Sequence, residues 1–174
     1  PGLQVARING NQWAISARGF NSQYSNKLLV MIDGRTIYTP LFSGVLWDSQ
    51  DYLMEDIDRI EVVRGPGGTI WGANAVNGVI NIITKNAAQT QGAYVAQTFG
   101  TLDKSITEAR YGGTTANNDS YRLYVKKAVR GPVDKYNTNG VSGGDGNTRQ
   151  SAGFKYDLTS IQDSKISIHG DVSS

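Results

Sequence analysis

The feature that most constrains this chain is a pair of strand-like runs joined by a segment too rich in glycine to be a strand. The pair lies within residues 57–85, IDRIEVVRGPGGTIWGANAVNGVINIITK. Ile60–Val63 alternates charged and apolar residues, and Val79–Thr84 concentrates β-branched residues, a composition that favours strands. Each run is expected to bury at least one face. The middle of the glycine-rich bend, Thr69–Val76, is predicted to form about two turns of helix with Trp71 packed inward.

Upstream of this pair, an Asp33-Gly34 step separates two apolar runs, Leu28–Ile32 and Arg35–Tyr38. Such a step predicts a β-hairpin, because both central residues of the tight turn must tolerate a positive φ angle. Trp13–Arg18 alternates and is predicted to be a short strand. Residues 1–12 show little periodicity and are expected to form an irregular entry segment, whereas Thr39–Asp51 is expected to be a loop with unusually many apolar residues.

Three motifs, taken together and in this order, resemble the plug domain of TonB-dependent outer-membrane receptors, the barrels that import scarce iron complexes and cobalamin. The motifs are ISARGF at Ile15–Phe20, LLVMIDGR at Leu28–Arg35 and RIEVVRGPGGTIWGANAVNGVINIITK at Arg59–Lys85. The resemblance implies an α+β plug domain over residues 1–86, with a small mixed sheet and short helices. It also implies that the chain is a fragment, because it lacks a secretion signal and the N-terminal box through which such receptors bind TonB.

After Lys85 the pattern changes. Residues 86–91 are polar and are predicted to be a hinge, and segments of about ten residues with period-two alternation follow. The segments with clear alternation are Tyr121–Arg130, Gln150–Thr159 and Ile166–Val172, and two earlier segments, Ala93–Phe99 and Ser105–Tyr111, alternate less cleanly but fit between the same turns. Short connections at 114–120 and 160–164 and a long one at 131–148 are typical of outer-membrane barrels. Residues 87–174 are therefore expected to be the first roughly five antiparallel strands of an incomplete transmembrane β-barrel, since closure takes about 22 strands in such receptors.

Composition excludes several classes of function. The chain has no cysteine and one histidine, which leaves no thiolate nucleophile, no zinc-thiolate site and no Ser-His-Asp triad. A net charge of +2 without a basic stripe argues against nucleic acid as a partner. The glycine-rich RGPGGTIWG does not match a phosphate loop, because Gly72 is followed by Ala73 and Asn74 rather than Lys and Ser or Thr. We expect neither an enzyme nor a bound cofactor or metal, and we expect His169 and the acids at Glu55, Asp56 and Asp58 to be solvated.

Two arginines stand at strand ends beside glycine, Arg18 and Arg64. From the residues alone, they are partly solvated strand ends. In the receptors that this chain resembles, the arginines at these motif positions pair with barrel glutamates and hold the plug in the barrel. The resemblance therefore assigns Arg18 and Arg64 to a plug-barrel lock.

The resemblance also places two plug loops on the extracellular side, as the floor of the ligand site. Aromatic and amide side chains on such loops can hold a chelate by stacking and hydrogen bonds. The alternative is that the aromatic residues fold back onto the plug. The candidate ligand-binding residues are Asn21, Ser22, Gln23, Tyr24, Ser25, Tyr38, Phe42 and Trp47.

The function that follows is active uptake of a metal chelate, such as siderophore-iron or haem, or of cobalamin, across the outer membrane of a Gram-negative bacterium. The expected partners are TonB, the ligand and outer-membrane lipid, and exposed strand edges would also permit a homo-oligomer. The alternative is a self-contained soluble β-rich binding protein with a plug-like module. The two hypotheses differ in what the alternating faces of residues 150–172 meet, which is lipid in the first and a second protein layer in the other.

Overall fold

The computed structural model describes residues 2–10, 12–17, 19, 22, 26–39, 41–72, 74–133, 144–159 and 166–174. These residues form two compact units. The first unit comprises Pro1–Gln50 and Ile57–Thr84, and the second comprises Asp51–Asp56 and Lys85–Ser174. A six-residue segment, 51–56, therefore belongs with the second half of the chain although the sequence on both sides of it belongs to the first unit.

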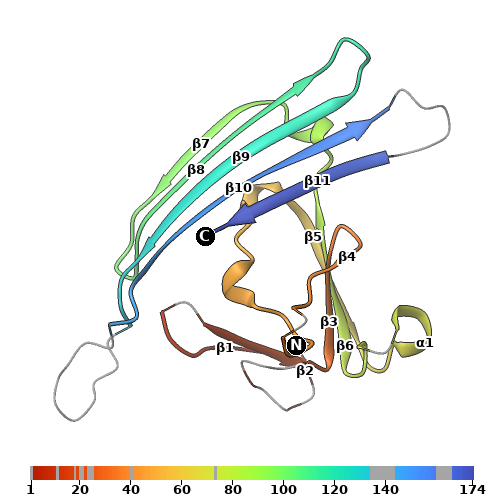
Figure 1. Ribbon diagram of the computed structural model, residues 1–174, viewed down its shortest axis with the longest axis vertical. Coiled ribbons are helices and arrows are strands. Elements are labelled where there is room, and N and C mark those ends of the chain that lie inside the picture. Colours follow the sequence, from red (N-terminus) through yellow and green to blue (C-terminus); the bar gives the residue numbers. More distant parts are fainter. Residues whose placement is uncertain are drawn as a thin grey trace. The chain divides into compact units, whose positions relative to one another are not determined.

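The first unit is built on a four-stranded mixed sheet of strands β3 (Leu28–Ile32), β4 (Arg35–Thr36), β5 (Ile57–Arg64) and β6 (Gly78–Thr84). The order is β4-β3-β6-β5, in which β3 and β6 are parallel and the other pairs are antiparallel (Figure 1). All of β3 is buried, and it shares a small core with β6. The predicted small mixed sheet with short helices is confirmed.

The predicted hairpin at Asp33-Gly34 is also confirmed. Asp33 and Gly34 have φ angles of 47° and 80°, as a tight turn between β3 and β4 requires. The Asp33 carboxylate accepts hydrogen bonds from the Thr84 amide (2.8 Å) and the Thr84 hydroxyl (2.6 Å). This carboxylate thereby fixes the end of β6 against the hairpin turn and helps to set the parallel register of the two central strands.

The entry segment is not irregular, and that prediction is wrong. Strand β1 (Leu3–Arg7) pairs antiparallel with β2 (Trp13–Ala17), with Leu3 opposite Ala17 and Arg7 opposite Trp13. The three central residues of β1 are exposed, so the strand has no buried apolar face that would produce an alternating sequence pattern. Its pairing with β2, and not its own pattern, makes it a strand.

The glycine-rich bend also differs from the prediction. Helix α1 is a single turn, Gly68–Trp71, and it ends at Gly72, whose φ angle of 95° interrupts the helix. Trp71 is 40% exposed rather than packed inward. Strand β5, the edge strand of the sheet, was expected to bury one face, but Asp58–Arg64 are all exposed, so no described element covers either face of this stretch.

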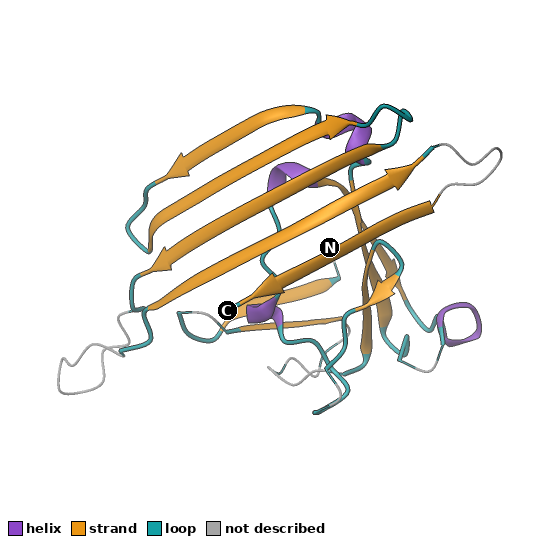
Figure 2. Cartoon of the chain, turned by 45° about the horizontal axis from the view of Figure 1, so that its top comes forward, coloured by secondary structure: helices purple, strands orange, loops and turns teal. Residues whose placement is uncertain are grey.

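The second unit contains a five-stranded antiparallel sheet in which every strand pairs with its neighbours in sequence (Figure 2). The predicted antiparallel strands are confirmed. They are β7 (Gly92–Thr98), β8 (Asp103–Thr114), β9 (Ser120–Arg130), β10 (Asn147–Leu158) and β11 (Ile166–Ser173). The sheet is open, with β7 and β11 as its edges.

The two faces of this sheet differ in chemistry. One row of directly paired residues runs Val95, Ala109, Val125, Ala152, Val172, and we name the face that carries it the apolar face. The adjacent row runs Tyr94, Arg110, Tyr124, Gly153, Asp171, and we name the face that carries it the polar face. Large side chains on the apolar face are exposed, as Val125 (57%) and Val172 (69%) show.

The segment expected to be a polar hinge is a packed turn instead. Helix η3 (Ala87–Thr90) starts with a capping box between Asn86 and Gln89, and Ala87 and Thr90 are fully buried. The Ala87 amide donates to the Asp157 carboxylate of β10 at 2.6 Å. Capping and burial fix this turn on the sheet, which a polar composition alone does not reveal.

No helix in the described part of the chain is both long enough and apolar enough to span a membrane. Most of the long connection at 131–148 and the connection at 160–164 lie outside the described residues.

Candidate functional site

Most of the first predicted ligand loop lies outside the described residues. This applies to Asn21, Gln23, Tyr24 and Ser25, and also to Arg18 of the predicted lock. Ser22 is described and exposed. The remaining predicted site residues, Tyr38, Phe42, Trp47 and Arg64, all belong to the first unit.

Tyr38 follows β4 and packs against the buried cluster of Leu29, Met31, Ala75 and Val79. Its hydroxyl donates a hydrogen bond of 2.8 Å to the carbonyl of Leu28. Burial raises the pKa of Tyr38 to about 12, because the phenolate would lose its hydration inside the protein. The side chain is therefore neutral at physiological pH, and its hydroxyl is used within the fold.

Phe42 and Trp47 lie in the segment between β4 and β5. Phe42 is partly buried in a turn that the Thr39-Gly44 bridge closes. Trp47 begins helix η1 (Trp47–Ser49) and lines, with Trp13, a hollow of about 10 Å³. That volume is roughly the minimum for one water molecule and is far too small for a chelate. Trp13 and Trp47 therefore line a hollow that is too small to serve as a ligand cleft.

Arg64 ends β5 and is exposed. Its side chain lies against the backbone of Gly2, since a Cβ atom placed at Gly2 would come within 2.7 Å of the Arg64 Cδ. The described residues of the first unit thus hold this side chain beside the entry of the chain.

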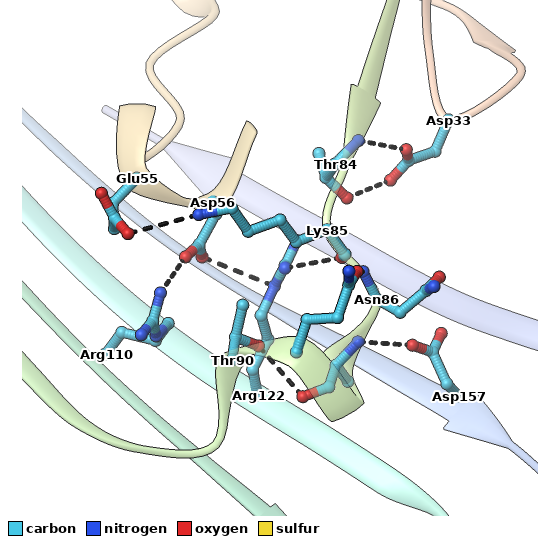
Figure 3. Close-up of polar contacts among 12 residues, drawn as sticks. Asp33, Glu55, Asp56, Thr84, Lys85, Asn86, Thr90, Arg110, Arg122 and Asp157 are labelled. Carbon is cyan, nitrogen blue, oxygen red and sulfur yellow. Dashed lines mark hydrogen bonds and ion pairs between the residues drawn. The ribbon is translucent and has the colours of Figure 1, made fainter. Parts of the chain in front are cut away.

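The most extensive polar network in the described residues involves none of these positions. It forms within the second unit, where residues 51–56, which we name the crossing segment, lie on the polar face of the five-stranded sheet (Figure 3). Helix η2 (Met54–Asp56) makes the last turn of this segment. The crossing segment contacts residues of four strands, β8, β9, β10 and β11.

At one end of the crossing segment, Asp56 pairs with two arginines from neighbouring strands. Arg110 of β8 donates to one carboxylate oxygen of Asp56, and the Arg122 Nε of β9 lies 3.5 Å from the other (Figure 3). The three side chains are nearly inaccessible, with exposed fractions of 5% for Asp56, 10% for Arg110 and 6% for Arg122. Arg122 also donates to the Lys85 carbonyl at 2.8 Å.

At the other end of the segment, Lys126 of β9 is the centre of a second group. Its ammonium lies 2.9 Å from the Asp51 carboxylate and 3.2 Å from that of Glu108, and it donates to the Tyr52 carbonyl. The Ser151 hydroxyl of β10 donates to the Asp51 carbonyl at 3.0 Å. Both carboxylates and the backbone of the segment therefore engage a single buried lysine.

Tyr52 extends the contact to the last strand. Its hydroxyl donates to the Asp171 carboxylate of β11 at 2.6 Å, and its ring lies 6.4 Å from that of Tyr124. A Cβ atom at Gly153 would lie 2.4 Å from the Tyr124 ring, so the glycine in this row leaves the space that the ring fills. Aromatic contact and charge pairing together hold the segment across the sheet.

This network overturns one expectation. Asp56 was expected to be a solvated residue at a helix start, but it is buried and paired with two cations. Asp56 and its two arginine partners are more than 50 residues apart in sequence, so no local pattern predicts the pairing. The sequence signal for this network was the alternation of β9, which places Arg122 and Lys126 on the face opposite Leu123 and Val125.

No cluster of three or more His, Asp or Glu side chains in the described residues is arranged to bind a metal ion. The chemistry of the network is ion pairing and hydrogen bonding alone. A buried ion pair is weak evidence for net stability. Removing or displacing one partner is costly, however, because it leaves the other charge buried and unpaired.

Comparison with known proteins identifies the first unit. Residues 1–79 match the family model described as the TonB-dependent Receptor Plug Domain. The chain is 33% identical over 118 residues to the vitamin B12 transporter BtuB of Vibrio vulnificus, a match that covers 67% of this chain and 18% of the relative. The chain belongs to the TonB-dependent receptors.

Two further comparisons agree. An iron-regulated outer membrane virulence protein of Vibrio cholerae is 38% identical over 94 residues, covering 51% of this chain and 14% of that protein. The ferric yersiniabactin uptake receptor FyuA from Yersinia pestis shares the fold, with a TM-score of 0.72 at 22% identity over 99% of this chain and 27% of that one. This TonB-dependent receptor chain spans less than a fifth of the length of these curated relatives.

Proposed function

We propose that this chain supplies the plug domain, residues 1–86, and the first barrel strands, residues 87–174, of a receptor in the outer membrane of a Gram-negative bacterium. The receptor takes up a metal chelate or cobalamin, and TonB drives the uptake from the periplasm through an N-terminal box. Relatives that the chain matches bear the names of a vitamin B12 transporter and an iron-regulated outer membrane protein, which supports this range of ligands.

The observation that carries the proposal is the contrast between the two faces of the five-stranded sheet. The apolar face exposes Val95, Leu123, Val125 and Phe154, whereas the polar face is covered by the crossing segment and holds buried ion pairs. Alternating apolar-out and polar-in strands are what a membrane-spanning barrel requires. A soluble binding protein would instead cover the apolar face with a second layer.

Specific residues take roles in this proposal. Arg18 and Arg64 would contact barrel strands beyond those of this chain, in addition to the contacts of the crossing segment. The open edges at β7 and β11 would pair with further strands of the receptor or, in the isolated chain, with a second copy. The floor of the ligand site would comprise Asn21, Ser22, Gln23, Tyr24, Ser25, Tyr38, Phe42 and Trp47.

Tryptophan placed on either face of β7 tests the membrane assignment. Val95→Trp on the apolar face and Tyr94→Trp on the polar face are compared in a background with the native tryptophans, Trp13, Trp47 and Trp71, changed to phenylalanine. In brominated detergent micelles, we expect strong fluorescence quenching at position 95 and little at 94, because bromine quenches only tryptophan that touches the acyl chains. Equal quenching at both positions would favour the soluble alternative.

Uptake tests the transport function. The whole receptor that carries this chain is produced in a Gram-negative host without its own cobalamin and ferric-chelate receptors, in the presence and absence of TonB. We expect accumulation of one of these labelled ligands only in the TonB-containing host. Accumulation that is independent of TonB, or no accumulation of any ferric chelate, haem or cobalamin, would contradict the proposal.

A further inference from the structure

The arginine pair that holds Asp56 has features of a preformed anion site. Arg110 and Arg122 project from neighbouring strands, and each guanidinium is also positioned by a group other than Asp56. The Arg110 Cζ lies 5.1 Å from the centre of the Tyr94 ring, and Arg122 donates to the Lys85 carbonyl at 2.8 Å. Cation-π contact and a backbone hydrogen bond thus orient both groups independently of the carboxylate between them.

The charges within this site are unequal. Two nearly inaccessible guanidinium groups pair with the one carboxylate of Asp56 that the crossing segment places between them, and the Arg110 Nε has no hydrogen-bond partner among the described residues. Buried arginines with an unused donor favour ligands that offer more than one anionic oxygen. Opposite Arg122 in the adjacent strand stands Gly112, against which the Thr90 carbonyl packs, so the end of η3 bounds the site on that side.

We propose that Arg110 and Arg122 form an oxyanion site that the chain occupies with its own Asp56 carboxylate, and that becomes available when the crossing segment leaves the polar face. Its ligand class is a molecule that presents a carboxylate or phosphate group. In the receptor, that group belongs to the transported ligand, so this part rests on the proposed function. Asp56 then serves as a resident competitor that offsets part of the positive charge of the pair while the segment is in place.

The test replaces the resident carboxylate by a free one. Asp56→Ala removes the competitor and leaves space for formate beside the two arginines. We expect formate to raise the melting temperature of this variant by about 3 °C or more relative to chloride at equal ionic strength, since a ligand that binds only the folded state stabilises it. The parent chain, in which Asp56 occupies the site, should not respond.

Asp58→Ala is the matched control, because Asp58 is an exposed carboxylate two residues away that pairs with Arg59 on the surface. Formate should not stabilise this variant, nor one in which Arg110→Gln is added to Asp56→Ala. A formate effect equal in all variants, or none in Asp56→Ala, would overturn the oxyanion site. If Asp56→Ala does not fold in chloride, its refolding yield in formate compared with chloride provides the same readout.

A second variant tests which anionic groups the site binds. Changing Asp51, Tyr52 and Asp56 together to glycine clears the polar side chains of the crossing segment, and binding of citrate and of inorganic phosphate is then measured by calorimetry. We expect at least one of the two anions to bind, and binding of neither would overturn the oxyanion site. These measurements involve no transport, so their failure is distinct from a failure of the uptake experiment.

Discussion

Replacing Asp56 by alanine is expected to lower the free energy of unfolding of the second unit by about 3–5 kcal/mol, which is the cost of removing one partner of a buried ion pair. The substitution leaves Arg110 and Arg122 facing each other without a carboxylate, in surroundings where their exposed fractions are 10% and 6%. The measurement is amide hydrogen exchange of β8 and β9 under native conditions, which reports the opening free energy of these strands.

Two features of the chain supply the controls. Asp58→Ala removes a carboxylate that is 40% exposed and paired on the surface, so it should change stability by about 0.5 kcal/mol or less. Tryptophan fluorescence follows the first unit alone, because Trp13, Trp47 and Trp71 all lie there. Equal effects of Asp56→Ala and Asp58→Ala on the protection of β8 and β9 would contradict a buried network at Asp56.

The second large effect is expected at Gly112. A Cβ atom at this position of β8 would lie 2.1 Å from the Thr90 carbonyl oxygen and 2.9 Å from its carbonyl carbon. The obstacle is the backbone at the end of η3, which no change of side-chain conformation can move. Gly112→Ala should therefore separate η3 from the sheet and destabilise the second unit by about 3 kcal/mol, the upper end of typical overpacking costs.

Gly68→Ala is the control for this substitution. Gly68 begins α1, and a Cβ atom there would meet nothing within 4 Å. Because alanine favours helix over glycine, this change should be neutral or stabilise the first unit by up to about 1 kcal/mol. The readout is the urea midpoint of unfolding, and loss of protection at Ala87 and Thr90 locates the damage. A Gly112→Ala protein with unchanged protection at η3 would contradict the close approach.

The crossing segment connects two stretches of the first unit in sequence, yet it packs on the strands of the second unit. Its carboxylates, backbone carbonyls and tyrosine engage residues of four successive strands, so the segment specifies how those strands lie under it. Desolvation offsets much of the attraction within a buried ion pair, and an arrangement that separates the partners leaves a buried charge unpaired. We therefore expect the segment to fix position more than to add net stability.

The sequence alone determined the elements whose signal is local. The five antiparallel strands of the second unit followed from period-two alternation, and the β3-β4 hairpin followed from Asp33-Gly34, because a side chain's face in a strand and a positive φ angle depend only on near neighbours. The order of three motifs was enough to suggest the family.

Only the tertiary structure decided the rest. Strand β1 exists because β2 pairs with it, the turn at Ala87–Thr90 is ordered because it packs on the sheet, and Asp56 is buried because Arg110 and Arg122 approach from 54 and 66 residues away. These interactions join residues that no periodic pattern in the sequence links. The sequence does not show whether an aspartate is solvated or paired with a buried arginine, because the fold determines which residues surround it.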